Sequence, residues 1–129
     1  MRMSANQLAQ LVIRLGLGIN MLMHGLVRLP KLNTFVAKTS AGFTATILPE
    51  LLIKAFLYVL PFAEFSSGLL ILLGGRFSKI GYTLGGLIIS ALLFGTTLKE
   101  DWAGAGNQLI YVIAFYLALR GLEDNSRRW

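Results

Sequence analysis

Residues 47–73 read ILPELLIKAFLYVLPFAEFSSGLLILL, and this stretch decides the fold class. Its only charged side chains are Glu50, Lys54 and Glu64. A helix of about 20 largely apolar residues crosses roughly 30 Å of hydrocarbon, because each residue adds 1.5 Å. The stretch therefore predicts a transmembrane helix rather than a helix of a soluble core.

Three further stretches of the chain have the same apolar character. We expect transmembrane helices over residues 5–29, 47–73, 80–98 and 105–122. The longest connector, residues 30–46, mixes Leu, Phe and Val with Lys and Thr. This fits an amphipathic piece that lies on the outer membrane surface or caps the bundle, or else a plain loop. The predicted fold is all-α: a single transmembrane domain over residues 1–129, built as an antiparallel four-helix bundle.

The composition excludes several classes of protein. The chain has 129 residues, of which 55% are hydrophobic and 14% charged, whereas soluble domains average roughly 25% charged residues. The formal net charge is +6, but the basic residues are scattered and form no strip typical of nucleic-acid binding. The absence of cysteine excludes disulfides and thiolate-held metal or iron–sulfur centres within this chain, and we expect no metal site.

The distribution of Lys and Arg predicts the orientation in the membrane. Four spans place both termini on the side of the connector at residues 74–79, and this side has six basic residues: Arg2, Arg76, Lys79, Arg120, Arg127 and Arg128. The opposite side has four: Arg28, Lys31, Lys38 and Lys99. Cytoplasmic loops are enriched in Lys and Arg, so we expect a multi-pass protein of a bacterial inner membrane with cytoplasmic termini.

Small residues in the third span predict close helix packing. Gly81, Gly85 and Gly86 lie there at spacings that let two helices approach closely. The sequence does not decide whether the partner helix belongs to the same bundle or to a second copy in a homo-oligomer.

Ionisable side chains inside a span are costly and tend to mark function. Arg14 and Glu64 lie equally far from the cytoplasmic ends of the first and second predicted helices. We therefore expect them to form a buried ion pair, which is either a structural clamp or a functional site. The functional alternatives are a proton relay and a site for a polar headgroup, with Glu64 as the titrating member.

A second polar group is expected nearer the opposite surface. His24 and Arg28 are one helical turn apart and share a face. The start of the fourth helix contributes four residues at that depth: Trp102, Asn107, Gln108 and Tyr111. We expect an outer pocket in which His24 exchanges protons and Arg28 anchors an anion. The alternatives are interface-belt aromatics for Trp102 and Tyr111, and a snorkelling helix end for Arg28.

Several motifs resemble those of a known family. The runs RLGLG at 14–18, HGLVR at 24–28 and PFAEFSSGLLILLG at 61–74, with the segment 94–111, resemble the DoxX family of small four-helix bacterial membrane proteins. That family includes the DoxD-type subunits of thiosulfate:quinone oxidoreductase. The resemblance implies a quinone-linked membrane role and matches Arg14, His24, Arg28 and Glu64 to the family's polar residues.

Two functions of different classes remain open at this point. The first is a quinone-binding membrane subunit of an oxidoreductase, with His24, Glu64 and Arg14 as catalytic residues and a partner redox subunit as electron donor. The second is a non-catalytic membrane anchor or assembly factor for a redox or other membrane complex. The absence of cysteine favours the second, and the intramembrane ionisable residues favour the first.

Overall fold

The computed structural model describes residues 2–126, and this part of the chain is all-helical. The elements in chain order are α1 (Ala5–Arg28), the short 3₁₀ helix η1 (Leu29–Lys31), α2 (Leu32–Ala41), α3 (Glu50–Leu73), α4 (Arg76–Leu98) and α5 (Trp102–Ser126). Four of these helical stretches are long and apolar enough to cross a membrane. The predicted all-α, four-helix transmembrane bundle is confirmed, and the chain is a multi-pass membrane protein.

Local signals in the sequence fix where the helices begin. Ser4 caps α1: its Oγ accepts a hydrogen bond from the Gln7 amide at 3.1 Å, while the Gln7 side chain accepts one from the Ser4 amide at 2.9 Å. The carboxylate of Asp101 accepts a hydrogen bond from the Gly104 amide at 3.1 Å in the first turn of α5. Gly74 and Gly75 adopt positive φ angles of 85° and 59° in the tight turn before α4.

These signals place two helix starts earlier than the hydropathy pattern predicts. Helix α4 begins at Arg76 rather than at residue 80, and α5 begins at Trp102 rather than at residue 105. The extra turn of α4 carries Arg76, Ser78 and Lys79, which a hydropathy count assigns to a connector. The extra turn of α5 directly follows three charged residues, 99–101, which hide its start in the same count. The glycine turn and the Asp101 cap determine the true boundaries.

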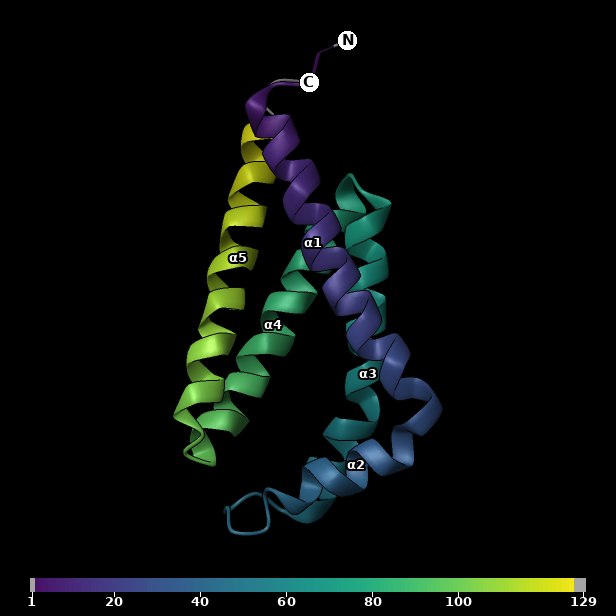
Figure 1. Cartoon of the computed structure of the whole chain (residues 1–129), viewed down its shortest axis with the longest axis vertical. Coiled ribbons are helices and arrows are strands. Elements are labelled where there is room, and N and C mark those ends of the chain that lie inside the picture. Colours follow the sequence, from purple (N-terminus) through teal and green to yellow (C-terminus); the bar gives the residue numbers. More distant parts are fainter. Residues whose placement is uncertain (1, 127–129) are drawn as a thin grey trace.

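The four long helices form two pairs that diverge toward one end of the molecule (Figure 1). Helix α1 packs along α3, and α4 packs along α5, while α3 and α4 join the pairs. The first turn of α1, the α3–α4 turn and the last turns of α5 lie together at what we name the termini end. Helix α2 lies across the opposite end, the connector end, so most of the connector expected at residues 30–46 is helical and is no plain loop.

Glycines set the distance and register between α1 and α3. A Cβ atom on Gly18 would lie 2.6 Å from Leu72 Cδ2, and one on Gly25 would lie 2.6 Å from the Phe65 amide nitrogen. A Cβ atom on Gly68 would lie 2.6 Å from Leu22 Cα. The two backbones therefore touch at Gly25 and Gly68, and at Gly18 the Leu72 side chain packs directly on the backbone of α1, as small residues permit in membrane helices.

The glycines of α4 also face helices of the same chain. Gly81 lies against Ile71, and Gly85 lies against Phe115 and Ser67. Two buried hydroxyls fasten the same interface, because Ser67 Oγ donates to the Gly81 carbonyl at 2.8 Å and Ser78 Oγ donates to the Ile71 carbonyl at 2.7 Å. The small-residue face of α4 is thus used within the bundle.

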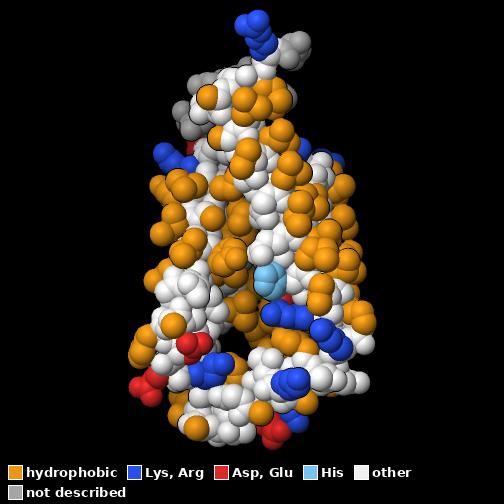
Figure 2. Space-filling model, in the orientation of Figure 1, with side chains coloured by type: hydrophobic (Ala, Val, Ile, Leu, Met, Phe, Trp, Pro, Cys, Tyr) orange, Lys and Arg blue, Asp and Glu red, His pale blue; other side chains and the backbone are white. Residues whose placement is uncertain are grey.

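The buried interior between the helices is narrow, and the outer surface of the bundle is apolar. Tyr82 and Phe115 pack edge to face at the centre, with ring centroids 6.4 Å apart, next to the buried Met21 and Ile71. Large apolar side chains cover the outer faces of the helices, whereas charged side chains gather toward the ends (Figure 2). An outer surface of this kind suits a lipid environment, because in water its apolar side chains would stay exposed to solvent.

Candidate functional site

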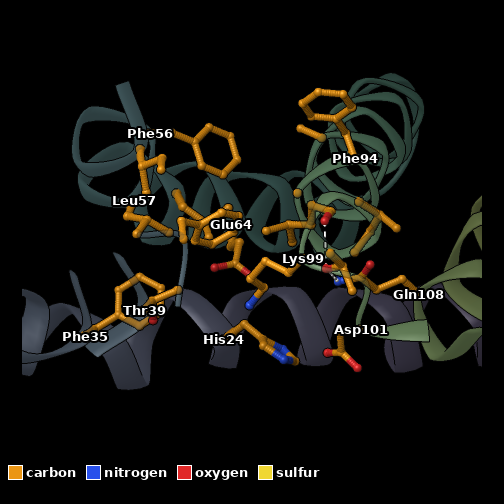
Figure 3. A pocket seen from close by; sticks show the side chains of 18 of the residues that line it. His24, Phe35, Thr39, Phe56, Leu57, Glu64, Phe94, Lys99, Asp101 and Gln108 are labelled. Atoms are coloured by element: carbon orange, nitrogen blue, oxygen red, sulfur yellow. Dashed lines mark hydrogen bonds between the residues drawn. The ribbon is translucent and has the colours of Figure 1, made fainter. Parts of the chain in front are cut away.

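A cavity of about 690 Å³ lies at the connector end, where the helix pairs diverge and α2 closes the space. Its walls are mostly apolar and come from all five α-helices (Figure 3). The polar and charged lining residues include Asn20, His24, Arg28, Thr39, Glu64, Thr96, Lys99, Asp101, Gln108 and Tyr111. An apolar cleft with a few convergent polar groups is the usual form of a small-molecule site.

The charged centre of this cavity is an ion pair between α1 and α3. Arg28 Nη1 donates to Glu64 Oε1 at 2.8 Å. The Glu64 side chain is 3% exposed and that of Arg28 30%, so the carboxylate is buried and the guanidinium reaches toward the cavity mouth. The Phe35 ring of α2 stacks on the guanidinium, 4.6 Å from its carbon atom. Helix α2 thereby covers the pair and holds Arg28 in place.

His24 lies one turn before Arg28, on the exposed rim of the same cavity. Its Nδ1 lies 2.7 Å from the Asn20 carbonyl oxygen, which can only accept a hydrogen bond. Nδ1 is therefore the donor in this hydrogen bond. This arrangement fixes the His24 ring at the rim, one turn from the positive charge of Arg28.

The α4 and α5 side of the cavity carries a second set of polar groups. The Lys99 ammonium lies 4.7 Å from the centre of the Phe43 ring, which brings the end of α4 against the connector. Gln108 Nε2 donates to Thr96 Oγ1 at 2.9 Å, a bond drawn as a dashed line in Figure 3. Gln108 Oε1 is buried and has no hydrogen-bond partner within residues 2–126. A buried acceptor of this kind usually meets a donor from a ligand or water.

The predicted ion pair between Arg14 and Glu64 is wrong, because Glu64 pairs with Arg28 instead. Arg14 lies at the termini end, against Gly74 of the α3–α4 turn. The prediction aligned the two helix ends, but the glycine contacts shift α1 along α3 by roughly three helical turns. The first turns of α1 therefore project past the end of α3, and Glu64 lies level with Gly25.

The outer pocket expected from the sequence is present in part. His24, Arg28, Gln108 and Tyr111 line the cavity together, from opposite ends of the chain. Two expected members do not: Asn107 and Trp102 are exposed residues outside the lining, and Trp102 is 65% exposed. On the helix surface Asn107 points about 100° away from Gln108, so only one of the two neighbours faces the cavity. Exposure of Trp102 at the start of α5 agrees with the interface-belt alternative.

Lys99, Phe35 and Phe43 were not among the residues singled out as site candidates. Each lies in or beside a connector, where the hydropathy pattern does not indicate whether a side chain points into the bundle. The apolar residues of segment 30–46 were the available signal, because a surface loop has little reason to carry them. Among the side chains that the structure describes, residues 2–123, no three His, Asp or Glu gather closely enough to hold a metal ion.

No protein-family model, curated protein or solved structure matches this chain. The resemblance to the DoxX family therefore stays a prediction from the quoted motifs.

Proposed function

We propose that this membrane protein binds a lipid-soluble quinone in the connector-end cavity and serves as the quinone-linked subunit of a DoxX-like oxidoreductase. One observation carries the proposal: the Arg28–Glu64 pair lies in the wall of a mostly apolar cavity of about 690 Å³. A quinone needs this combination, an apolar space for its ring and hydrogen-bond donors for its two carbonyl oxygens.

The residues of the cavity fit such a guest. Aromatic and aliphatic side chains, among them Phe35, Phe43 and Leu57, would contact the ring faces. The Arg28 guanidinium has further N–H groups beyond the one given to Glu64, and these can donate to a carbonyl oxygen. The unpartnered Gln108 Oε1 would accept from a hydroxyl of the reduced form.

Quinone, when bound, supplies two-electron chemistry coupled to two protons. In this proposal His24 Nε2 exchanges protons between the rim and the cavity, and Glu64 keeps the Arg28 guanidinium directed at the guest. Arg14, assigned a catalytic role from the sequence, takes no part because it lies at the other end of the bundle. We place the electron donor on a partner subunit, because this chain has no cysteine for a thiolate-held centre.

The test is mass spectrometry of quinone extracted from the mildly solubilised protein. Wild type is compared with Glu64→Gln and His24→Ala, and Arg76→Gln at the termini end is the control. We expect near one quinone per chain in wild type and in the control. The cavity variants should retain about tenfold less, a loss of roughly 1.4 kcal/mol, because Glu64→Gln no longer holds the Arg28 guanidinium toward the guest and His24→Ala removes a polar group from the rim. If no variant carries quinone while a partner protein co-purifies, the proposal fails in favour of a non-catalytic membrane anchor.

A further inference from the structure

A second cavity, of about 1100 Å³, lies at the termini end between α1, α4 and α5. Four cationic side chains line it: Arg14, Arg76, Lys79 and Arg120. Among the described lining residues Glu123 is the one carboxylate. The cavity therefore has a strong excess of positive charge, and it plays no part in the quinone proposal.

Arg14 is the innermost of these cations. It projects from α1 toward the α3–α4 turn, where the missing side chain of Gly74 makes room for it: a Cβ atom there would lie 2.6 Å from Nη1. Among residues 2–123, whose side chains the structure describes, no carboxylate lies within ion-pair distance of Arg14. A half-buried guanidinium without a counter-charge is costly in a membrane protein, so an anion from outside the chain would stabilise it.

Tyr82 provides an independent sign that a ligand belongs here. Its side chain is fully buried at 0% exposure and lines the cavity, yet its hydroxyl has no hydrogen-bond partner in the described part of the chain. The Oε1 atom of Gln10, from α1, is likewise buried and unpartnered. Buried tyrosine hydroxyls almost always find a partner. An O–H donor among cations is suited to an oxyanion.

The remaining walls show which oxyanion fits. Leu11, Leu119 and Leu122 line the same cavity beside the cationic residues. The site therefore combines charge for a headgroup with an apolar surface continuous with the lipid-facing helices. Basic pockets of this kind between membrane helices suit anionic lipid headgroups, and Arg matches a phosphate with paired N–H groups.

We propose that the termini-end cavity binds the phosphate group of an anionic phospholipid, with Arg14 and Tyr82 as the inner contacts and Arg76 and Lys79 at the rim. The lipid would tie α1, α4 and α5 together at the end where α1 projects past α3. This site is separate from the quinone cavity, so either proposal can fail without the other.

The test is native mass spectrometry of the full-length protein released from vesicles of equal parts phosphatidylglycerol and phosphatidylcholine. The variants are Arg14→Gln, Tyr82→Phe and Arg76→Gln/Lys79→Gln, with Lys38→Gln at the connector end as the charge-matched control. We expect one phosphatidylglycerol retained per chain. Retention should fall about tenfold in Arg14→Gln, as for loss of one charged hydrogen bond, and about threefold in Tyr82→Phe, which keeps the core volume.

Quinone content in the same samples is expected to stay unchanged, which separates this site from the other cavity. Equal retention of the two lipids, or loss of phosphatidylglycerol in Lys38→Gln as large as in Arg14→Gln, would overturn the proposal. A parallel arm adds inorganic phosphate to lipid-free protein in detergent. Tight phosphate binding there, without preference for the lipid, would also overturn the phospholipid assignment and leave a soluble phosphate as the ligand.

Discussion

Arg28 and Glu64 form a 2.8 Å ion pair that joins the last turn of α1 to the middle of α3. The two partners differ in surroundings, because the carboxylate is 3% exposed and the guanidinium 30% exposed. Phe35 of α2 stacks on the guanidinium, so three helices meet at this pair. The pair is therefore both a structural link and the polar wall of the connector-end cavity.

Removing either partner should destabilise the protein, but unequally. Arg28→Gln leaves a buried carboxylate without its counter-charge, and we expect it to cost about 3 kcal/mol, the low end for breaking a buried pair. Glu64→Gln should cost less, because Arg28 can turn toward the cavity mouth. Thermal unfolding in detergent micelles measures both.

The double variant Arg28→Gln/Glu64→Gln should be more stable than Arg28→Gln alone, because no buried charge is left unpaired. The control is Lys54→Gln, which breaks the exposed Glu50–Lys54 pair of α3 and should change the unfolding midpoint little. The buried-pair interpretation would be contradicted if the two single variants lost the same free energy of unfolding and the loss in the double variant equalled the sum of the two.

The sequence predicted the fold well because the fold depends on length and hydrophobicity, which are local properties. It failed on the Arg14–Glu64 pair because the depth of a residue depends on register, and register is set by contacts between helices. Gly18, Gly25 and Gly68 determine how far α1 slides along α3, and no count from the helix ends reveals that. Arg28, assigned to an anion site, is thus the partner of Glu64.

The relative placement of residues was predicted correctly where they lie on one helix. His24 and Arg28 share a face because they are four apart on α1, and both line the cavity. Asn107 and Gln108 are adjacent, and which one faces inward depends on the rotation of α5 against α4. Lys99 and Phe43 meet only because the connector folds back across the bundle, a tertiary contact without a local signal.

Alanine at Gly25 or Gly68 should separate α1 from α3. In both positions the new Cβ would meet backbone atoms of the facing helix, which cannot turn aside as a side chain can. Overpacking of this kind costs about 1–3 kcal/mol, and we expect the upper part of that range here. The measurement is the unfolding midpoint in detergent, with helix content followed by circular dichroism.

Gly16→Ala is the matched control, since a Cβ atom there would have nothing within 4 Å. It should be neutral or stabilising by up to about 1 kcal/mol, because alanine is the better helix former. A loss in Gly16→Ala comparable to that in Gly25→Ala would mean that the α1–α3 contact does not set stability.

The hydroxyls of Ser67 and Ser78 should each contribute to the α3–α4 interface. Both are buried and donate to a backbone carbonyl, that of Gly81 or Ile71. We expect Ser67→Ala and Ser78→Ala each to lower the free energy of unfolding by about 1 kcal/mol, the usual net value of such a bond. Ser90→Ala is the control, because the exposed Ser90 hydroxyl bonds only within α4 and its removal should have little effect. Equal effects in all three variants would show that the interface bonds carry no special weight.

The native chain lacks cysteine, so single cysteines can report its orientation without background. Asn6 and Lys79 are exposed at the termini end, Thr44 is exposed in the connector, and Ser66 faces outward in the middle of α3. Excess Lys and Arg at the termini end favours the cytoplasm for that side. In intact spheroplasts a membrane-impermeant maleimide should therefore label Thr44→Cys but neither Asn6→Cys nor Lys79→Cys. Permeabilisation of the membrane should make Asn6→Cys and Lys79→Cys accessible to the reagent.

The control Ser66→Cys should stay unlabelled in both intact and permeabilised spheroplasts, because hydrocarbon suppresses thiolate formation. The reverse pattern would invert the orientation, whereas labelling of Asn6→Cys and Lys79→Cys from opposite sides would contradict a fold in which both residues lie at one end of a four-span bundle.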